Sequence, residues 1–149
     1  MSSHIAGVIR RYYTDLWSMG NLSVADDIFA PDVTLYGPEH PDGVHGVEAI
    51  EREVIATREA FPDLRLMVDR QVIEGDRAMV RWSMLGTQAG EYRGLSPTDR
   101  IILLSGIDLL YFKEGKIAMI WSYFDAMVAY QQRAGTVETT KVPVKVASR

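Results

Sequence analysis

The sequence predicts an α+β fold, in which about three N-terminal helices cover the open side of a strongly curved antiparallel sheet and a short helix follows at the C-terminal end. Two observations predict it. Apolar residues recur at helical spacing up to Pro62, and beyond it they alternate with polar residues, as in strands with one buried face. A chain of 149 residues, 47% hydrophobic and 24% charged, is also long enough to bury a core and a pocket in one domain.

The first two helices are expected within the first 30 residues. One spans residues 5–17 and ends near Gly20. Its apolar face consists of Ile5, Val8, Ile9, Tyr12, Tyr13 and Leu16. A shorter helix over 22–30 ends where Pro31 disfavours helical geometry in the residue before it.

A strand, a loop and the third helix are expected next. Residues 32–37 predict a short strand, and residues 38–46 are dense in Pro and Gly and predict a loop. The third helix covers 47–61 and is stopped by Pro62. Its apolar face consists of Val47, Ile50, Val54, Ile55 and Ala60.

The second half of the chain predicts four long strands joined by short turns. They cover 63–75, 76–88, 99–115 and 116–125. Strands this long need bends, and Gly86 and Gly106 are suitable bend or bulge positions. A curved sheet covered by helices leaves a cone-shaped cavity, which suits a small, mostly apolar ligand.

The C-terminal end predicts a helix and a tail. A closing helix over 126–135 ends at Gly135, so we expect one domain over 1–135. The polar tail over 136–149 is either a frayed end or an arm that reaches a partner.

Composition excludes several function classes. A net charge of −4 without a basic stripe argues against nucleic acid as a partner. With no cysteine and three histidines that lack ligand spacing, no metal site is expected, and no cofactor is expected because no glycine-rich phosphate loop is present. No apolar run approaches 18 residues and the N-terminus does not read as a signal peptide, so we expect a cytoplasmic protein without membrane contact.

Five stretches, taken in order, resemble the SnoaL-like polyketide cyclase family of the nuclear transport factor 2-like superfamily. They are "AFPDL" (60–64), "EGDRAMVRW" (74–82), "GTQAGEYRG" (86–94), "SPTDR" (96–100) and "GKIAMIWSYFD" (115–125). The resemblance covers roughly residues 5–135. It implies a cone-shaped barrel that often dimerises and binds apolar, ring-bearing molecules. Known members include aldol cyclases, and relatives include ketosteroid isomerases and non-catalytic binding modules, so the fold alone leaves function open.

Asp108 is the first candidate catalytic residue. A carboxyl group among Leu, Ile and Phe has its pKa raised by burial and can stay protonated. This stretch resembles the ketosteroid isomerases. In those enzymes the matching aspartate stays neutral and donates a hydrogen bond to an oxyanion. The resemblance makes Tyr12 the second donor. The alternatives are that Asp108 points outward to an arginine or a partner, and that Tyr12 is a core aromatic.

The expected base is missing from its family position. The resemblance to the isomerases puts Gly37 where those enzymes carry an aspartate. Among the polar residues that follow, His40 is the candidate base, since a histidine titrates near neutral pH. His45 is expected instead to lie at the entry of the third helix.

Ser122 and Asp125 complete the candidate set. In the polyketide cyclases the acid/base aspartate falls on the position of Ser122, and a histidine falls on that of Asp108, so the cyclase mechanism cannot be carried over unchanged. Asp125 ends the last strand and is either catalytic or the cap of the following helix, with capping favoured.

The last strand has two apolar faces. By the family resemblance one face lines the cone. Trp17, Tyr36 and Trp82 are further candidate pocket walls, the alternative being that they are ordinary core aromatics. The lining face carries Ile120, Ser122 and Phe124. The opposite face, with Trp121 and Tyr123, predicts a homodimer formed through the outer side of the sheet.

Two function hypotheses follow from these residues. The preferred one is a cofactor-free enzyme that stabilises the enolate of an apolar carbonyl or polyketide-like compound through Asp108, in cyclase- or isomerase-type chemistry. The alternative is a ligand-binding module or dimeric scaffold that has lost its acid/base residues. A weaker third possibility is oxygenation without a cofactor.

Overall fold

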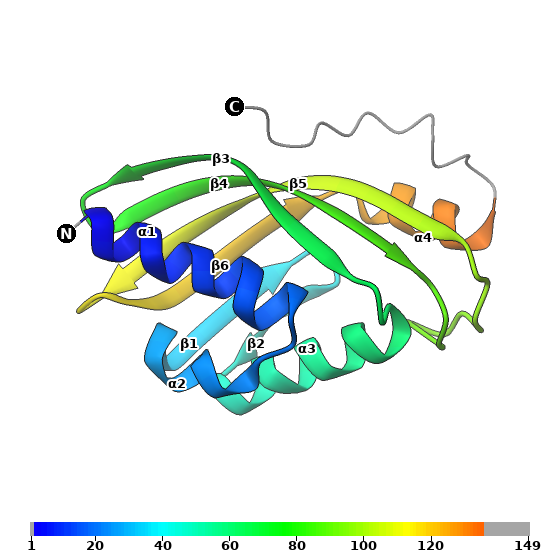
Figure 1. Cartoon of the computed structure of the whole chain (residues 1–149), viewed down its shortest axis with the longest axis horizontal. Helices are drawn as coiled ribbons and strands as arrows, with labels where there is room; N and C mark the ends of the chain where they lie inside the picture. Colours follow the sequence, from blue (N-terminus) through cyan, green and yellow to red (C-terminus); the bar gives the residue numbers. More distant parts are fainter. Residues whose placement is uncertain (1, 136–149) are drawn as a thin grey trace.

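The protein is built from an arched sheet with helices packed on its concave side (Figure 1). The computed structural model describes residues 2–135. The tail predicted over 136–149 lies outside these residues.

The helices cover the concave face of the sheet, except α4, which lies at one end of it (Figure 1). Their bounds are α1 Ser2–Arg10, η1 Arg11–Ser18, η2 Leu22–Val24, α2 Ala25–Ile28, α3 Val47–Ala60 and α4 Ala126–Ala134. The helical pattern over 5–17 is confirmed as α1 and η1 together, and their buried side chains enter the main core.

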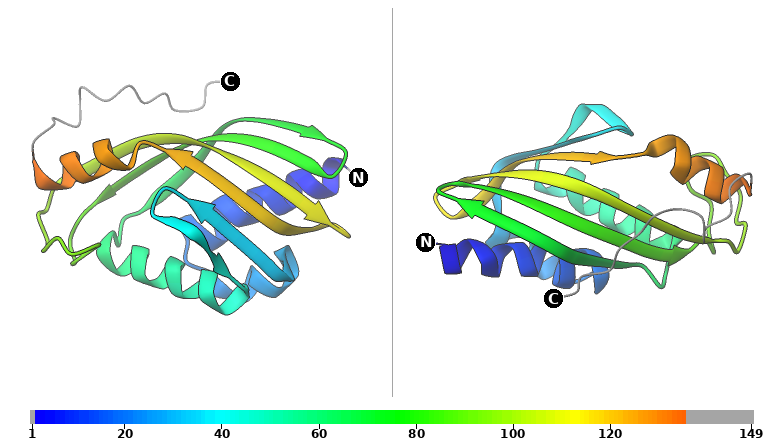
Figure 2. Two further views of the ribbon diagram at one scale, coloured as in Figure 1. Left: turned by 180° about the vertical axis from the view of Figure 1, so that it is seen from behind. Right: turned by 90° about the horizontal axis from the view of Figure 1, so that it is seen from above.

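The six strands of the described region form one sheet in the order β2-β1-β6-β5-β4-β3 (Figure 2). They are β1 Phe29–Gly37, β2 His40–His45, β3 Arg65–Glu74, β4 Arg77–Thr87, β5 Ile101–Lys113 and β6 Lys116–Phe124. The predicted α+β cone fold and its four long strands are confirmed. In detail the sheet is mixed and open, because β1 runs parallel to β6 while every other pair is antiparallel.

The region predicted as a loop over 38–46 contains the edge strand β2, so that prediction was wrong. An edge strand tolerates Pro41, since an unpaired amide is not needed on its open side, and Gly43 has a φ of 93°. Strand β1 also begins earlier than expected and includes Pro31, where its pairing with β6 shifts register between Phe29 and Thr34.

The helix that follows α1 changes its winding. Residues Arg11–Ser18 form a π-helix, in which hydrogen bonds join residues five apart instead of four. Tyr12 and Trp17, five positions apart, therefore lie on one side of η1, with ring centroids 6.5 Å apart. Such wide turns are frequent at functional sites, and this one carries aromatic side chains to the concave side of the sheet.

Gly106 is required where β4 and β5 pair. It lies opposite Trp82, and a Cβ at this position would overlap Trp82 Cζ2 and lie 2.7 Å from the Tyr123 carbonyl oxygen. Gly106 was predicted as a bend or bulge position, but β4 and β5 pair through it without a register shift. Its role is close approach instead, since only a residue without a side chain lets the Trp82 indole lie against the strand.

No helix among the described residues is long and apolar enough to cross a membrane.

Candidate active site

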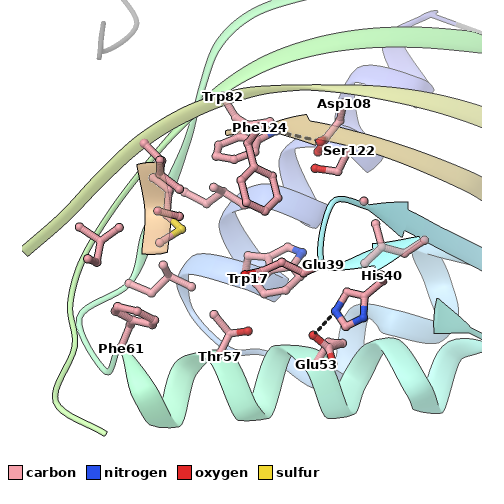
Figure 3. A pocket seen from close by; sticks show the side chains of 18 of the residues that line it. Trp17, Glu39, His40, Glu53, Thr57, Phe61, Trp82, Asp108, Ser122 and Phe124 are labelled. Carbon is pink, nitrogen blue, oxygen red and sulfur yellow. Dashed lines mark hydrogen bonds and ion pairs between the residues drawn. The ribbon is translucent and has the colours of Figure 1, made fainter. Parts of the chain in front are cut away.

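A cavity lies between the concave face of the sheet and the helices (Figure 3). Its volume is about 140 Å³. Most of its wall is apolar, with side chains such as Leu35, Phe61, Leu66, Met84 and Leu104. Two groups of polar side chains line it, one around Asp108 and one around His40, and Thr57 and Arg133 line it as well.

Asp108 lies in the cavity wall on β5 and is 4% exposed. The Tyr13 hydroxyl donates to its Oδ2 at 2.5 Å, and the Trp82 indole N–H donates to its Oδ1 at 2.8 Å. Ser122 lies opposite it on β6 and also hydrogen-bonds to it. The expectation that this carboxyl group is buried is confirmed, and it points inward and not toward an arginine.

The burial of Asp108 sets its ionisation. Burial raises the pKa of this carboxyl group above its ordinary value, although the side chains that hydrogen-bond to it oppose the rise. An ionised carboxylate loses its hydration in an apolar wall, so the neutral form gains stability. The site therefore favours a protonated Asp108 over a wider pH range than water does.

The two tyrosines of η1 occupy different positions relative to the cavity. Tyr12 lines the cavity, whereas Tyr13 is fully buried behind it and holds Asp108. The sequence singled out Tyr12. It could not show which of the two adjacent tyrosines contacts Asp108, because the π-helical winding of this segment is not visible in the spacing of its apolar residues. Burial and the nearby Asp108 raise the pKa values of both hydroxyl groups, so both stay protonated.

The second polar group joins His40 to charged residues that the sequence did not single out. His40 Nε2 lies 2.9 Å from Glu53 Oε1 and 3.1 Å from Arg93 Nη2. Arg93 also contacts Glu53 Oε1 at 3.1 Å and Glu39 Oε1 at 3.3 Å. All four side chains line the cavity, and Figure 3 shows His40 and Glu53 on the side opposite Asp108 and Ser122.

A single ring nitrogen cannot serve both neighbours of His40 at once. Nε2 either carries a proton and donates to Glu53 or carries a lone pair and accepts from Arg93. When Nε2 donates to Glu53, the lone pair of the neutral imidazole is on Nδ1. This is the form in which His40 can accept a proton.

The segment between β4 and β5 delivers Tyr92 and Arg93 to the cavity. It folds around Gln88, which is fully buried and whose amide donates to the carbonyl oxygens of Gly90 and Leu95. A buried amide with its hydrogen bonds satisfied fixes the loop around it. The Arg93 guanidinium lies 4.7 Å from the Tyr92 ring centroid.

The remaining predicted residues divide into cavity wall and framework. Trp17, Tyr36 and Phe124 line the cavity together with Trp82 and Ser122. Ile120 is fully buried in the core and is not among the lining residues.

Asp125 and His45 also lie outside the cavity lining. Asp125 Oδ1 accepts from the Val128 amide at 3.1 Å and caps α4, the role that the sequence favoured. His45 is not the cap of α3, since Gly46 occupies that position and His45 contacts the Asp42 carbonyl oxygen. Among the described residues no group of three His, Cys, Asp or Glu side chains is placed to hold a metal ion.

The fold and its cavity define a class: α+β cone-fold proteins that enclose a small molecule beneath a curved sheet. A family model described as SnoaL-like polyketide cyclase matches residues 7–133. The chain belongs to this family.

Several solved structures share this fold. A candidate polyketide cyclase from Acidithiobacillus ferrooxidans is 26% identical, with 92% of this chain and 99% of that chain covered and a TM-score of 0.80. A candidate SnoaL-like polyketide cyclase from Jannaschia sp. CCS1 is 19% identical, with 89% and 92% covered and a TM-score of 0.81. A candidate hydroxylase from Streptomyces galilaeus is 24% identical, with 91% and 98% covered and a TM-score of 0.74. No curated protein matches the chain.

Proposed function

We propose that the protein is a cofactor-free acid–base catalyst that binds an apolar carbonyl or polyketide-like compound and stabilises its enolate, in cyclase- or isomerase-type chemistry. The observation that carries the proposal is Asp108, a buried carboxyl group with a raised pKa in the wall of a mostly apolar cavity. The family match and the candidate cyclase from Acidithiobacillus ferrooxidans support the cyclase branch.

Asp108 acts as the donor to the enolate oxygen. The Trp82 indole N–H can only donate, and Tyr13 stays protonated, so each carboxyl oxygen already accepts one hydrogen bond. The Ser122 hydroxyl donates to the carboxyl group as well, so the proton of neutral Asp108 is available to a ligand oxygen in the cavity as long as Ser122 keeps this donor role. Tyr12, which also lines the cavity, supplies a second donor.

His40 acts as the base. It removes a proton from the carbon next to the ligand carbonyl, and the electron pair of that C–H bond moves into the carbonyl group to form the enolate. Glu53 holds the imidazole and stabilises the imidazolium that results. The enolate then takes the proton back from the imidazolium at carbon, as in an isomerase. Alternatively it attacks a second carbonyl carbon, as in an aldol cyclase; the π electrons of that carbonyl move onto its oxygen, which takes the proton from the imidazolium.

The experiment measures proton exchange directly. With 2-tetralone, an enolisable bicyclic ketone, in D₂O, the wild type should accelerate the loss of the α-hydrogen NMR signals. Asp108→Asn and His40→Ala should each slow this by roughly 10²-fold, the usual size of a general acid–base or oxyanion contribution. Asp76→Asn, at an exposed turn, is the matched control and should leave the rate unchanged.

A titration of the Asp108 carboxyl carbon, followed by its chemical shift with and without a naphthol, gives an independent check. A pKa at the ordinary solvent value that the naphthol does not move, together with unchanged exchange in Asp108→Asn, would overturn the proposal.

A second candidate function is a binding module without catalysis. Ser122 and Gly37 both line the cavity, at the positions where the family resemblance would put a carboxylate. Gly37 packs beside Ser122, since a Cβ on it would lie 3.7 Å from Ser122 Cβ. Binding of the naphthol without any exchange of 2-tetralone would favour this candidate.

We also propose a homodimer through the outer face of the sheet. Met79, Ile107 and Tyr123, on the adjacent strands β4, β5 and β6, are 50%, 42% and 57% exposed. Exposed apolar side chains on neighbouring strands are typical of an interface.

A further inference from the structure

Arg133 is a buried cation that has no counterion in the part of the chain that the structure describes. It lies in the last turn of α4, lines the cavity and is 4% exposed. Its Nε is buried and has no hydrogen-bond partner, and no ion pair among residues 2–135 includes it. A guanidinium group cannot lose its proton in a protein, so its charge has to be met by another group.

The second arginine in the cavity is already neutralised. The Arg93 and Arg133 guanidinium carbons lie 4.7 and 5.4 Å from the centroid of the same Tyr92 ring. Arg93 is paired with Glu39 and Glu53, whereas the contacts of Arg133 are with aromatic rings. The positive charge at this end of the cavity is therefore carried by Arg133.

A second buried donor lines the same cavity without a partner. Among the described residues the Trp17 indole Nε1 has no partner within hydrogen-bond distance and angle, although its N–H lies near enough to the Tyr12 hydroxyl to lower the pKa of that group. The other unpartnered buried atom of the described region, Asp69 Oδ1, does not line the cavity. Both unmet groups of the cavity are thus donors, which calls for a ligand rich in acceptor oxygens.

We propose that Arg133 binds a carboxylate carried by the ligand, so that the substrate class is a ring-bearing carboxylic acid and not a neutral ketone alone. This inference shares one assumption with the proposed function, namely that the cavity binds an apolar ring compound. A planar guanidinium pairs with a carboxylate through two parallel hydrogen bonds, which a neutral amide cannot reproduce. Trp17 Nε1 donates to a further oxygen of the same ligand.

The test compares 2-naphthoate with 2-naphthamide, which share their rings and differ in charge. Isothermal titration calorimetry on the full chain at pH 7.5 should give the carboxylate tenfold to a hundredfold higher affinity, on the order of a charged hydrogen bond. Arg133→Met should abolish this preference while the amide binds as before. Arg133→Lys, which keeps the charge and loses the planar fork, should retain part of it.

Arg100→Met is the matched control, since Arg100 is exposed and does not line the cavity. It should keep the wild-type preference. Equal affinities of wild type for the two probes, or a preference that survives in Arg133→Met, would overturn the assignment. These measurements involve no proton transfer, so they stand even if 2-tetralone exchange shows no catalysis.

Discussion

At the residue scale, Asp108 shows how neighbouring groups tune one carboxyl group. The tyrosine and tryptophan that donate to it stabilise its charged form, and the apolar wall disfavours that form. The net rise in pKa shows that desolvation outweighs the donors. A group balanced in this way can give up and recover a proton without large rearrangement.

This balance predicts a pH-dependent stability. Because the folded pKa of Asp108 lies above the unfolded value of 3.8, its contribution is fully present below pH 3.8 and declines as the pH rises toward the folded pKa. Asp108→Asn lacks this titration. Its free energy of unfolding, relative to wild type, should therefore rise with pH above 3.8, by at most about 1.4 kcal/mol per pH unit. Urea unfolding across the pH range measures this, and a pH-independent difference would contradict it.

Gly106 makes a second prediction at this scale. Gly106→Ala should displace the Trp82 indole and break its bond to Asp108, because the new methyl group overlaps the ring. Losing a donor to the charged form should raise the pKa of Asp108 further. The carboxyl titration reports this shift. Gly7→Ala, where a Cβ meets nothing within 4 Å, should leave the pKa unchanged.

How far single residues could be predicted depended on their contrast with their neighbours. Asp108 stands out as a charge in an apolar strand. Glu53 and Arg133 look like ordinary surface charges of amphipathic helices, and only the fold turns them toward the cavity. The sequence offered no signal for them.

At the element scale, Asp125 separates a framework role from a catalytic one. Asp125→Ala should lower the free energy of unfolding by about 1 kcal/mol, the usual value of a lost helix cap. Tetralone exchange should be unaffected, since Asp125 lies outside the cavity lining. Asp125→Ser, which keeps a capping oxygen, should restore most of the stability. If both Asp125→Ala and Asp125→Ser fold but lose tetralone exchange, Asp125 would instead be catalytic.

Elements with strong periodicity were predictable, and elements set by tertiary pairing were not. The long strands β4 and β5 followed from alternation and turn residues. Strand β2 could not be found because Pro41 and Gly43 have low strand propensity, and its pairing with β1 overrides that preference.

At the scale of the whole molecule, the convex side of the sheet carries the dimer proposal. Ile107→Arg should give a monomer in sedimentation velocity, since it replaces an exposed apolar side chain beside Tyr123 by a second positive charge next to Arg81. Ile55→Arg is the matched control, since Ile55 is 43% exposed on α3, and it should not change the sedimentation coefficient. A wild type that sediments as a monomer would contradict the proposal.

The overall architecture was predictable from the order of helical and alternating segments. Its parallel pairing was not, because strand direction across distant segments leaves no local trace in the sequence. Two of the five stretches that carried the family resemblance lie in 86–100, and in the structure this segment delivers Tyr92 and Arg93 to the cavity. Part of the resemblance therefore reflects the shape of the site as well as the fold.

The parallel pairing of β1 with β6 has a consequence for how the chain folds. Phe29 pairs with Ile117, 88 positions later, whereas each of the strands β3 to β6 pairs with the strand next to it in the sequence. Closing so long a loop is slow relative to forming hairpins, so we expect the meander to assemble first and β1 and β2 to dock last. Tyr36 and His40 come from those two strands, so the cavity is complete only after this final docking step. Because β1 docks on β6, the protein can hold a ligand only after β6 has left the ribosome during synthesis.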